Sequence, residues 1–224
     1  EGVKRGFNIY TQLQKTHPSL DTLDIGGGFG VPYEKKKFYT AKGVSSKIIK
    51  ILKNLSDKAG IKHPNLVVEW GQYIVAPSQV TIYKVLSEKI IPKANAKAWY
   101  IVDGSFVNDI KDTWAIHQKF HIIPANNMYG ALRTTWLAGS TCDSDDKYTA
   151  GGNYILLPKL HENQDQFVAV FDTGAYQDGL ASHHCLLSAP LKIVAQDGMI
   201  KVARKRETAE SIGKLFGWIN GDHK

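Results

Sequence analysis

The sequence predicts two consecutive regions of different fold class: an α/β region over residues 1–77 and a β-rich region over residues 78–224. Two observations predict this division. In the first region, apolar runs of strand length alternate with segments whose apolar residues recur at helical spacing, which is typical of strand–helix–strand units. In the second, short β-branched and aromatic runs follow one another between turn-rich segments, as in sheet domains. We therefore expect a domain boundary near residue 77.

The elements expected in the first region are a helix around residues 3–10, a strand at 22–25, a helix after 45 and a strand at 66–68. Ser45 and Ser46 precede apolar residues spaced i, i+3, i+4 and i+7, so they are expected to cap an amphipathic helix. The breaker stretch 60–65 then separates this helix from an uninterrupted apolar run, which predicts a strand buried on both faces that ends at Glu69.

The strands expected in the second region are 80–87, 98–103, 154–157 and 167–171. The segment 191–204 predicts a hairpin, because Asp197 and Gly198 suit a two-residue type I′ turn between β-rich arms. Thr208 is expected to cap a short helix that carries three apolar residues.

The composition of the chain favours a globular protein over a nucleic-acid-binding, membrane-spanning or disulfide-rich one. The chain has 224 residues, of which 43% are hydrophobic, and its net charge of +7 comes from 28 basic and 21 acidic residues. The basic residues are spread widely, which favours a solvated surface over a nucleic-acid stripe, and no apolar run reaches membrane-span length. Two cysteines, Cys142 and Cys185, are too few for a disulfide framework, so free thiols in the cytoplasm are expected. The start has neither an initiator Met nor a signal peptide, which indicates a fragment of a longer chain.

Three consecutive glycines, Gly26, Gly27 and Gly28, follow the strand at 22–25. Glycine lets the backbone approach an anion closely, so a phosphate-binding loop is one interpretation and a ligand-free turn is the other. Glu69 ends the next strand, and the carboxyl ends of parallel strands share one edge where ligands bind. A carboxylate there can hold a proton on a ring nitrogen, although a salt bridge at the strand end is the alternative.

Five motifs occur in an order and spacing that carry a resemblance to a known family: LDIGGGFG, VVEWGQYIVAPS, STCDSDDKY, FDTGAYQ and RKRETAE. Together they resemble the fold type III pyridoxal-phosphate decarboxylases, which include ornithine, diaminopimelate and biosynthetic arginine decarboxylases. Within that family, the stretch 111–124 looks most like the arginine enzymes. The resemblance implies that residues 1–77 are the C-terminal strands of a pyridoxal-phosphate-binding (β/α)8 barrel. Residues 78–224 would be the C-terminal β-rich domain, of barrel or sandwich type.

The resemblance also implies roles for individual residues. The implied cofactor-binding residues are Gly26, Gly27, Gly28, Glu69, Gly71, Gln72 and Tyr176. Within this set the glycines hold the phosphate of pyridoxal phosphate and Glu69 holds its ring nitrogen. Cys142 is implied to return a proton to the substrate α-carbon, and Asp143 to bind a distal cationic group, with Asp112 as a second contact. An inert cysteine is the alternative for Cys142, and core packing is the alternative for Tyr176. Mg²⁺ enters as an accessory ion by family analogy alone.

Two departures from the family pattern limit this transfer of roles. Gln72 stands where the family commonly has an arginine, so one charged contact to the cofactor phosphate is in doubt. The Schiff-base lysine lies upstream of the glycine loop in the family, and that segment is not in this sequence. Lys93 lies in a similar string, PKANAK, but its position predicts an exposed turn. His183 and His184 are adjacent and face apart in any regular element, so no metal site is predicted.

The function expected from the resemblance is that of a carboxy-lyase, with arginine converted to agmatine in polyamine and spermidine biosynthesis. Ornithine, lysine and diaminopimelate stay open as substrates, because Asp143 suits any distal cation. Two other classes stay open as well: a catalytically inactive homologue that binds a partner protein, and a racemase on the same kind of barrel. A head-to-tail homodimer with shared active sites is implied, together with the missing N-terminal half of the barrel, and no nucleic-acid or membrane partner is expected.

Overall fold

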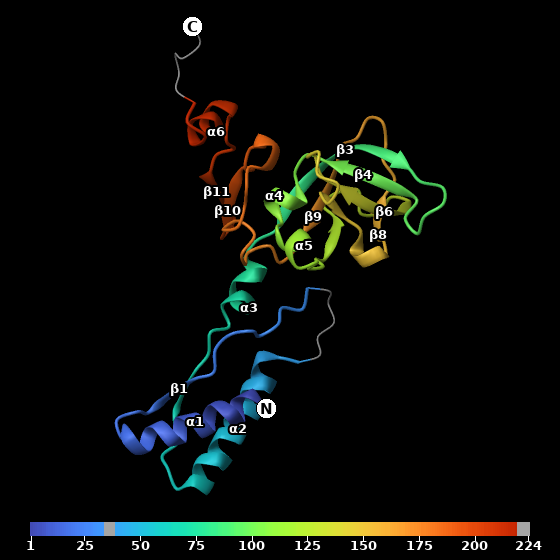
Figure 1. The fold of residues 1–224 in the computed structure, drawn as a ribbon. Helices are drawn as coiled ribbons and strands as arrows, with labels where there is room; N and C mark the ends of the chain where they lie inside the picture. The colour runs from blue at the N-terminus through green and yellow to red at the C-terminus, as the bar shows by residue number, and fades with distance from the viewer. Residues whose placement is uncertain (34–38, 219–224) are drawn as a thin grey trace. The chain divides into compact units, whose positions relative to one another are not determined.

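The computed structural model describes residues 1–33 and 39–218 and divides into two compact units, Glu1–Val75 and Ala76–Lys224 (Figure 1). Among the described residues, no helix is both long and apolar enough to cross a membrane. The α/β region followed by a β-rich region that the sequence predicts is the arrangement observed.

The described residues of the first unit, 1–33 and 39–75, form α1 (Gly2–Thr16), β1 (Thr22–Asp24), α2 (Ala41–Ala59), β2 (Asn65–Val67) and α3 (Gly71–Val75). β1 and β2 pair in parallel, with Leu23 opposite Leu66, which confirms the strand–helix–strand unit. The predicted cap of α2 is wrong. Thr40 caps this helix by accepting a hydrogen bond from the Gly43 N–H at 3.1 Å. Ser45 lies inside the helix, where its hydroxyl donates a hydrogen bond to the Ala41 carbonyl.

The core of the first unit lies between its two long helices and one face of the strand pair. Phe7, Tyr10 and Leu52 are its buried centre, and Leu66 packs against them. Alternate strand residues face opposite sides of a sheet, and Val67 on the other side is 43% exposed. The prediction of a strand buried on both faces is therefore wrong for this chain, because the second face of the two-stranded sheet is open.

The second unit is dominated by one curled sheet (Figure 1). Its elements are η1 (Ala76–Ser78), β3 (Thr81–Ile90), β4 (Ala98–Val102), α4 (Phe106–Asp109), α5 (Asp112–Ala115), β5 (Ile122–Pro124), β6 (Leu132–Ala138), β7 (Lys147–Tyr148), η2 (Ala150–Gly152), β8 (Ile155–Pro158), β9 (Gln166–Val170), η3 (His184–Leu186), β10 (Lys192–Gln196), β11 (Met199–Arg204) and α6 (Ala209–Leu215). The sheet has seven strands in the order β5-β9-β3-β4-β6-β7, with β8 also paired to β6. The predicted strands are confirmed as β3, β4, β8 and β9, and the sequence did not predict β5, β6 and β7.

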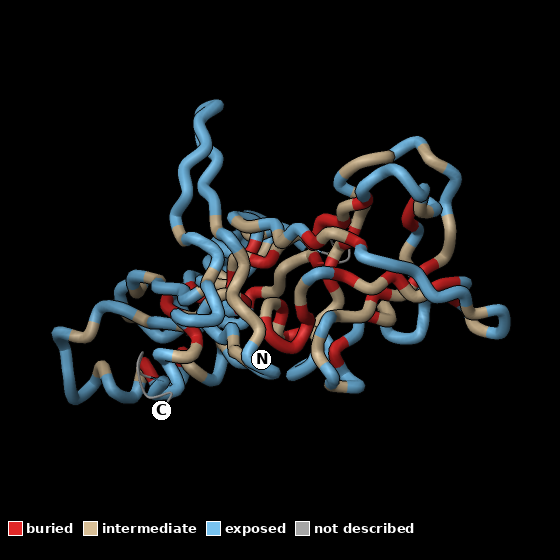
Figure 2. Tube along the Cα trace, turned by 90° about the horizontal axis from the view of Figure 1, so that it is seen from above, coloured by how far each residue is buried: buried red, intermediate tan, exposed pale blue. Residues whose placement is uncertain are grey.

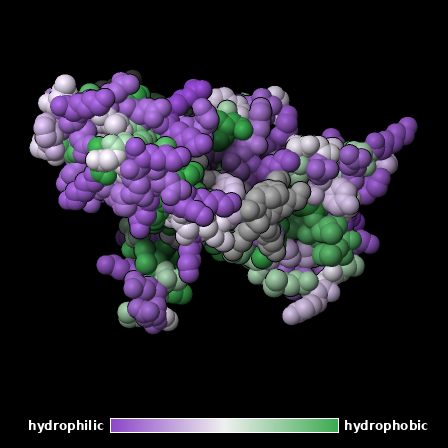
Figure 3. Space-filling model, turned by 90° about the horizontal axis from the view of Figure 1, so that it is seen from below, coloured by the Kyte–Doolittle hydropathy of each residue, from purple (hydrophilic) through white to green (hydrophobic). Residues whose placement is uncertain are grey.

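The apolar core of the second unit lies against this sheet. Tyr100, Phe106 and Leu137 are fully buried, and the Tyr100 hydroxyl donates to the Pro158 carbonyl at 2.8 Å, which satisfies its polar end. Figure 2 shows the buried residues concentrated in a few segments. Polar side chains cover much of the face in Figure 3, with separate apolar patches between them.

Three local predictions in the second unit are confirmed. Asp197 and Gly198 both have positive φ, at 51° and 76°, as a type I′ turn between β10 and β11 requires. Thr208 caps α6 by accepting a hydrogen bond from the Ser211 N–H. Lys93 is exposed in the turn that joins β3 to β4, as its position in the sequence predicts.

Candidate functional site

The glycine loop follows β1 in the first unit. Gly26 and Gly28 have φ of 71° and 81°, in the left-handed region that side chains disfavour. The Gly26 N–H donates to the Asp24 carboxylate at 2.7 Å. The N–H groups of Gly27 and Gly28 donate to no acceptor within residues 1–33 and 39–218, so both are available to an anionic ligand.

Glu69 lies directly beside this loop. Its N–H donates to the Gly26 carbonyl at 3.0 Å, and the Ile25 N–H donates to the Val67 carbonyl at 3.1 Å. A Cβ atom on Gly27 would lie 2.9 Å from the Glu69 carbonyl oxygen, so only glycine allows this approach. The structure thus brings the three glycines and Glu69 together at the carboxyl ends of two adjacent parallel strands.

Aromatic packing holds the segment that follows Glu69. The Phe29 ring, next to the glycine loop, stacks on Trp70 with centroids 4.3 Å apart and meets Tyr73 edge-on at 4.6 Å. α3 begins at Gly71, and the Gln72 amide donates to the Tyr33 hydroxyl at 2.9 Å. Gln72 therefore links α3 to the chain after the glycine loop, a role that needs an amide and no charge.

Replacement of Gly27 by alanine is expected to destabilise the first unit by about 1–3 kcal/mol, because the added methyl group meets a backbone carbonyl that cannot move freely. Thermal unfolding of the full-length protein measures this loss. Gly6→Ala is the matched control, since a Cβ at that helical position meets nothing within 4 Å. The control is expected to leave stability unchanged or raise it slightly. Equal midpoints for the two variants would show that the loop relaxes around the methyl group.

In the second unit, Cys142 lies in the loop between β6 and β7, which a buried carboxylate organises. Asp146 is 3% exposed and accepts hydrogen bonds from the Phe106 N–H at 2.7 Å, the Thr141 N–H at 3.0 Å and the Thr141 hydroxyl at 2.7 Å. Sequence reasoning missed Asp146. The signal was present, because Asp and Thr a few residues apart in a turn commonly bond the local backbone.

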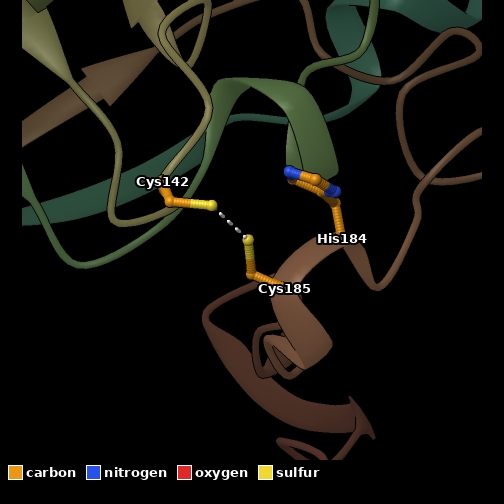
Figure 4. Close-up of side chains that lie close together, drawn as sticks. All are labelled: Cys142, His184 and Cys185. Atoms are coloured by element: carbon orange, nitrogen blue, oxygen red, sulfur yellow. Dashed lines mark hydrogen bonds between the residues drawn. The ribbon is translucent and has the colours of Figure 1, made fainter.

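Cys142 itself is exposed, and a second cysteine lies beside it. Its Sγ atom is 3.4 Å from the Sγ atom of Cys185 (Figure 4). The hydrogen bond with Cys185, followed by the charge that Cys185 can carry, raises the pKa of Cys142 above its ordinary value. A thiol with a raised pKa keeps its proton at neutral pH, as a proton donor must.

Asp143 is half-buried beside the cysteine pair, with its Oδ2 atom 3.8 Å from the His184 Nε2 atom. Sequence spacing did not predict that His184 would join Cys142 and Asp143. Its neighbour His183 faces elsewhere and bonds the Glu207 carboxylate at 2.7 Å.

Removal of Cys185 is expected to shift the alkylation of Cys142 to lower pH. The thiolate is the reactive form, and Cys185 raises the pKa of Cys142. In Cys185→Ala a larger thiolate fraction is therefore present at every pH below that pKa. Iodoacetamide modification followed peptide by peptide across the neutral to alkaline range measures the midpoint. Leu186→Ala, at an exposed neighbouring position, is the control and should match the wild type. An unchanged or higher midpoint in Cys185→Ala would contradict the assigned cause.

Asp112 does not present its carboxylate at the surface. It is 6% exposed, it accepts a hydrogen bond from the Gln177 amide at 2.7 Å, and its N–H donates to the Gln177 Oε1 atom at 3.1 Å. These contacts give Asp112 a structural role and disfavour the predicted contact with a distal cation. Tyr176 is 56% exposed and has a φ of 66°, a strained conformation for a non-glycine residue that the buried Gln177 next to it holds in place.

Comparison with known proteins places these features in context. Residues 1–76 match the family described as pyridoxal-dependent decarboxylase, pyridoxal binding domain. The chain is 31% identical over 196 residues to the diaminopimelate decarboxylase of Bacillus subtilis, covering 86% of this chain and 43% of that protein. It is 26% identical to the Methanocaldococcus jannaschii diaminopimelate decarboxylase, covering 96% of this chain and 47% of that protein.

Solved structures show the same fold. The crystal structure of the M. jannaschii diaminopimelate decarboxylase matches with a TM-score of 0.81 at 24% identity, over 96% of this chain and 47% of that one. The biosynthetic arginine decarboxylase of Campylobacter jejuni matches with a TM-score of 0.83 at 18% identity, over 97% of this chain and 52% of that one. The chain therefore spans about half the length of these relatives. The matches support the fold type III pyridoxal-phosphate decarboxylase family, and they do not confirm the predicted preference for arginine.

Proposed function

We propose, from the match of residues 1–76 to the pyridoxal-binding domain of the pyridoxal-dependent decarboxylases, that this chain is part of an enzyme that decarboxylates a basic amino acid. The hydrogen bond between the Glu69 N–H and the Gly26 carbonyl is the observation that carries the proposal. This backbone contact places Glu69 beside the glycine loop at the carboxyl ends of adjacent parallel strands, where barrel enzymes bind their ligands.

The residues of the first unit fit pyridoxal phosphate, the cofactor that this family uses. The N–H groups of Gly27 and Gly28 would hold its phosphate, and the closely packed backbone at Gly27 leaves no room for a side chain. Glu69 would keep a proton on the ring nitrogen. When bound, the cofactor accepts the electron pair that departing CO2 leaves behind.

In the second unit, Cys142 and Asp143 would act on the substrate. The Cys142 thiol, whose pKa Cys185 raises, carries a proton at neutral pH that it would deliver to the α-carbon after CO2 leaves. The Asp143 carboxylate is half-buried and would bind the cationic end of the side chain, which discriminates against neutral amino acids. We further propose a head-to-tail homodimer in which the Cys142 loop completes the partner's site.

Arginine is our first choice of substrate, and its product agmatine enters polyamine synthesis. The sequence relatives favour diaminopimelate as the second candidate, because the relatives described above include diaminopimelate decarboxylases. The two substrates differ at the distal end, where arginine has only a guanidinium group and diaminopimelate has an ammonium and a carboxylate. The negative charge of the Asp143 carboxylate suits the positive group of either substrate.

Release of CO2 by the full-length protein from arginine, ornithine, lysine and diaminopimelate tests the proposal. We expect release from arginine, reduced strongly in Cys142→Ala. Release from diaminopimelate alone would overturn the first choice and leave the reaction class intact. If no amino acid releases CO2 and added pyridoxal phosphate gives no imine absorbance, the decarboxylase proposal fails in favour of a binding homologue.

A further inference from the structure

Three side chains from two distant segments come together at the surface of the second unit (Figure 4). The ligand atoms of Cys142, His184 and Cys185 all lie within 4.8 Å of one another, and the three residues are exposed. The two sulfur atoms are 3.4 Å apart. Cys142 belongs to the loop between β6 and β7, whereas His184 and Cys185 belong to η3, so the cluster exists only in the folded chain.

Buried polar contacts outside the cluster fix η3. The His184 N–H donates to the Asn108 Oδ1 atom at 2.9 Å, and the Asn108 amide donates back to the His184 carbonyl at 3.0 Å. Asn108 is 3% exposed, so this anchor is part of the core. Because both backbone groups of His184 are held, its position does not depend on contacts made by its own imidazole ring.

Backbone strain marks the same segment. Cys185 has a φ of 57° and the next residue, Leu186, a φ of 55°, in the left-handed region that non-glycine residues disfavour. Strain of this kind persists only where surrounding structure enforces it. On the opposite side, Thr141 is bonded to the buried Asp146, which fixes the residue before Cys142. Both halves of the cluster are therefore held in place by groups that do not belong to it.

The ligand set suits a soft divalent cation. Two thiolates and one imidazole are zinc ligands, and tetrahedral Zn²⁺ with Zn–S bonds of about 2.3 Å places two sulfurs roughly 3.8 Å apart. The observed separation of 3.4 Å is close to that value. The Oδ2 atom of Asp143 lies 3.8 Å from His184 Nε2. This carboxylate places a negative charge beside the cluster, which favours a bound cation.

We propose that Cys142, His184 and Cys185 bind a soft divalent cation such as Zn²⁺, with water in the fourth position, and that the bound ion inhibits the enzyme. Each thiol loses its proton to solvent as its sulfur binds the metal, and no electrons are transferred. The ion would hold Cys142 as a thiolate, so that it has no proton to deliver to a substrate. The inhibition rests on the proposed function, whereas the binding does not.

Cobalt titration of the reduced, full-length protein under nitrogen tests the binding. We expect sulfur-to-cobalt charge-transfer absorption that saturates at one ion per chain and disappears when Zn²⁺ is added. Cys185→Ala and His184→Ala should each bind zinc on the order of 100-fold more weakly or worse, because losing a ligand exceeds the loss of an outer partner. His63→Ala, at an exposed histidine of the first unit, is the control and should bind like the wild type.

Two results of the cobalt titration would overturn the metal site, and a third result would come from the state of the thiols. One is the absence of sulfur-to-cobalt charge-transfer absorption in a wild-type protein whose two thiols are shown to be free. The other is absorption that persists in a folded Cys185→Ala variant, with folding confirmed by thermal unfolding. If the thiols pair as a disulfide even under reducing conditions, the metal site fails as well.

Measurement of CO2 release with and without Zn²⁺ distinguishes failure of the metal site from failure of the proposed function. Zn²⁺ should suppress CO2 release by the wild type, a chelator should restore it, and Cys185→Ala should lose at least part of this sensitivity relative to its own zinc-free rate. A cobalt signal without decarboxylation of any amino acid would support the metal site and sink the proposed function. Decarboxylation that saturating zinc leaves unchanged would overturn the inhibitory role.

Discussion

Replacement of Glu69 by glutamine is expected to lower the kcat of the full-length protein by about 10²–10⁴-fold, the range for loss of a positioned acid or base. Glutamine keeps the shape of glutamate and its backbone contact with Gly26, but it cannot hold a proton on a ring nitrogen through a negative charge. In the proposed site, the cofactor would then withdraw electrons less strongly. Because the backbone contact is kept, the fold should be unaffected.

Steady-state rates with the preferred amino acid, together with the absorbance of the bound cofactor, measure this effect. Glu162→Gln is the matched control, since Glu162 is an exposed glutamate of the second unit and its loss should leave kcat unchanged. If Glu69→Gln decarboxylates at the wild-type rate, Glu69 does not act on the ring nitrogen of the cofactor. A loss of thermal stability in Glu69→Gln alone would instead indicate that the carboxylate is part of the fold.

The first unit was predictable where a feature depends on local sequence. Helical spacing located α1 and α2, and the strand ends located the loop that meets Glu69. The cap at Thr40 was missed because it lies well before the apolar residues that reveal the helix. The exposure of Val67 was missed because the sequence of a strand does not show how many neighbours cover its faces.

The second unit was harder to predict because its contacts join residues far apart in the chain. β5 and β7 have three and two residues, too few to show an alternating pattern, and β6 pairs with strands from both sides of it in the sequence. The cluster of Cys142 and Cys185 shares this property. A spacing of 43 residues matches no metal-site motif, and the segment that carries Cys185 is held by a contact as distant in sequence as that between Asn108 and His184.

Replacement of Asp146 by alanine is expected to lower the free energy of unfolding by about 3 kcal/mol or more. The carboxylate is buried and accepts hydrogen bonds from the Phe106 N–H and from two groups of Thr141. Removing it leaves buried donors without a partner, and this costs more than the hydrogen bonds themselves contribute. The loop that carries Cys142 loses its anchor at the same time.

Asp145→Ala is the matched control, because Asp145 is the next carboxylate along the chain but is exposed and paired with Lys147 in solvent. Exposed pairs contribute about 1 kcal/mol or less, so only Asp146→Ala should lower the urea midpoint strongly.

In Asp146→Asn one acceptor oxygen survives, and an intermediate loss of the free energy of unfolding is expected. If Asp146 positions the loop as well as stabilising it, the alkylation rate of Cys142 should change in Asp146→Asn under conditions where that variant is fully folded. Equal urea midpoints for the Asp145 and Asp146 variants would contradict both roles, because no desolvated carboxylate would then be holding the loop.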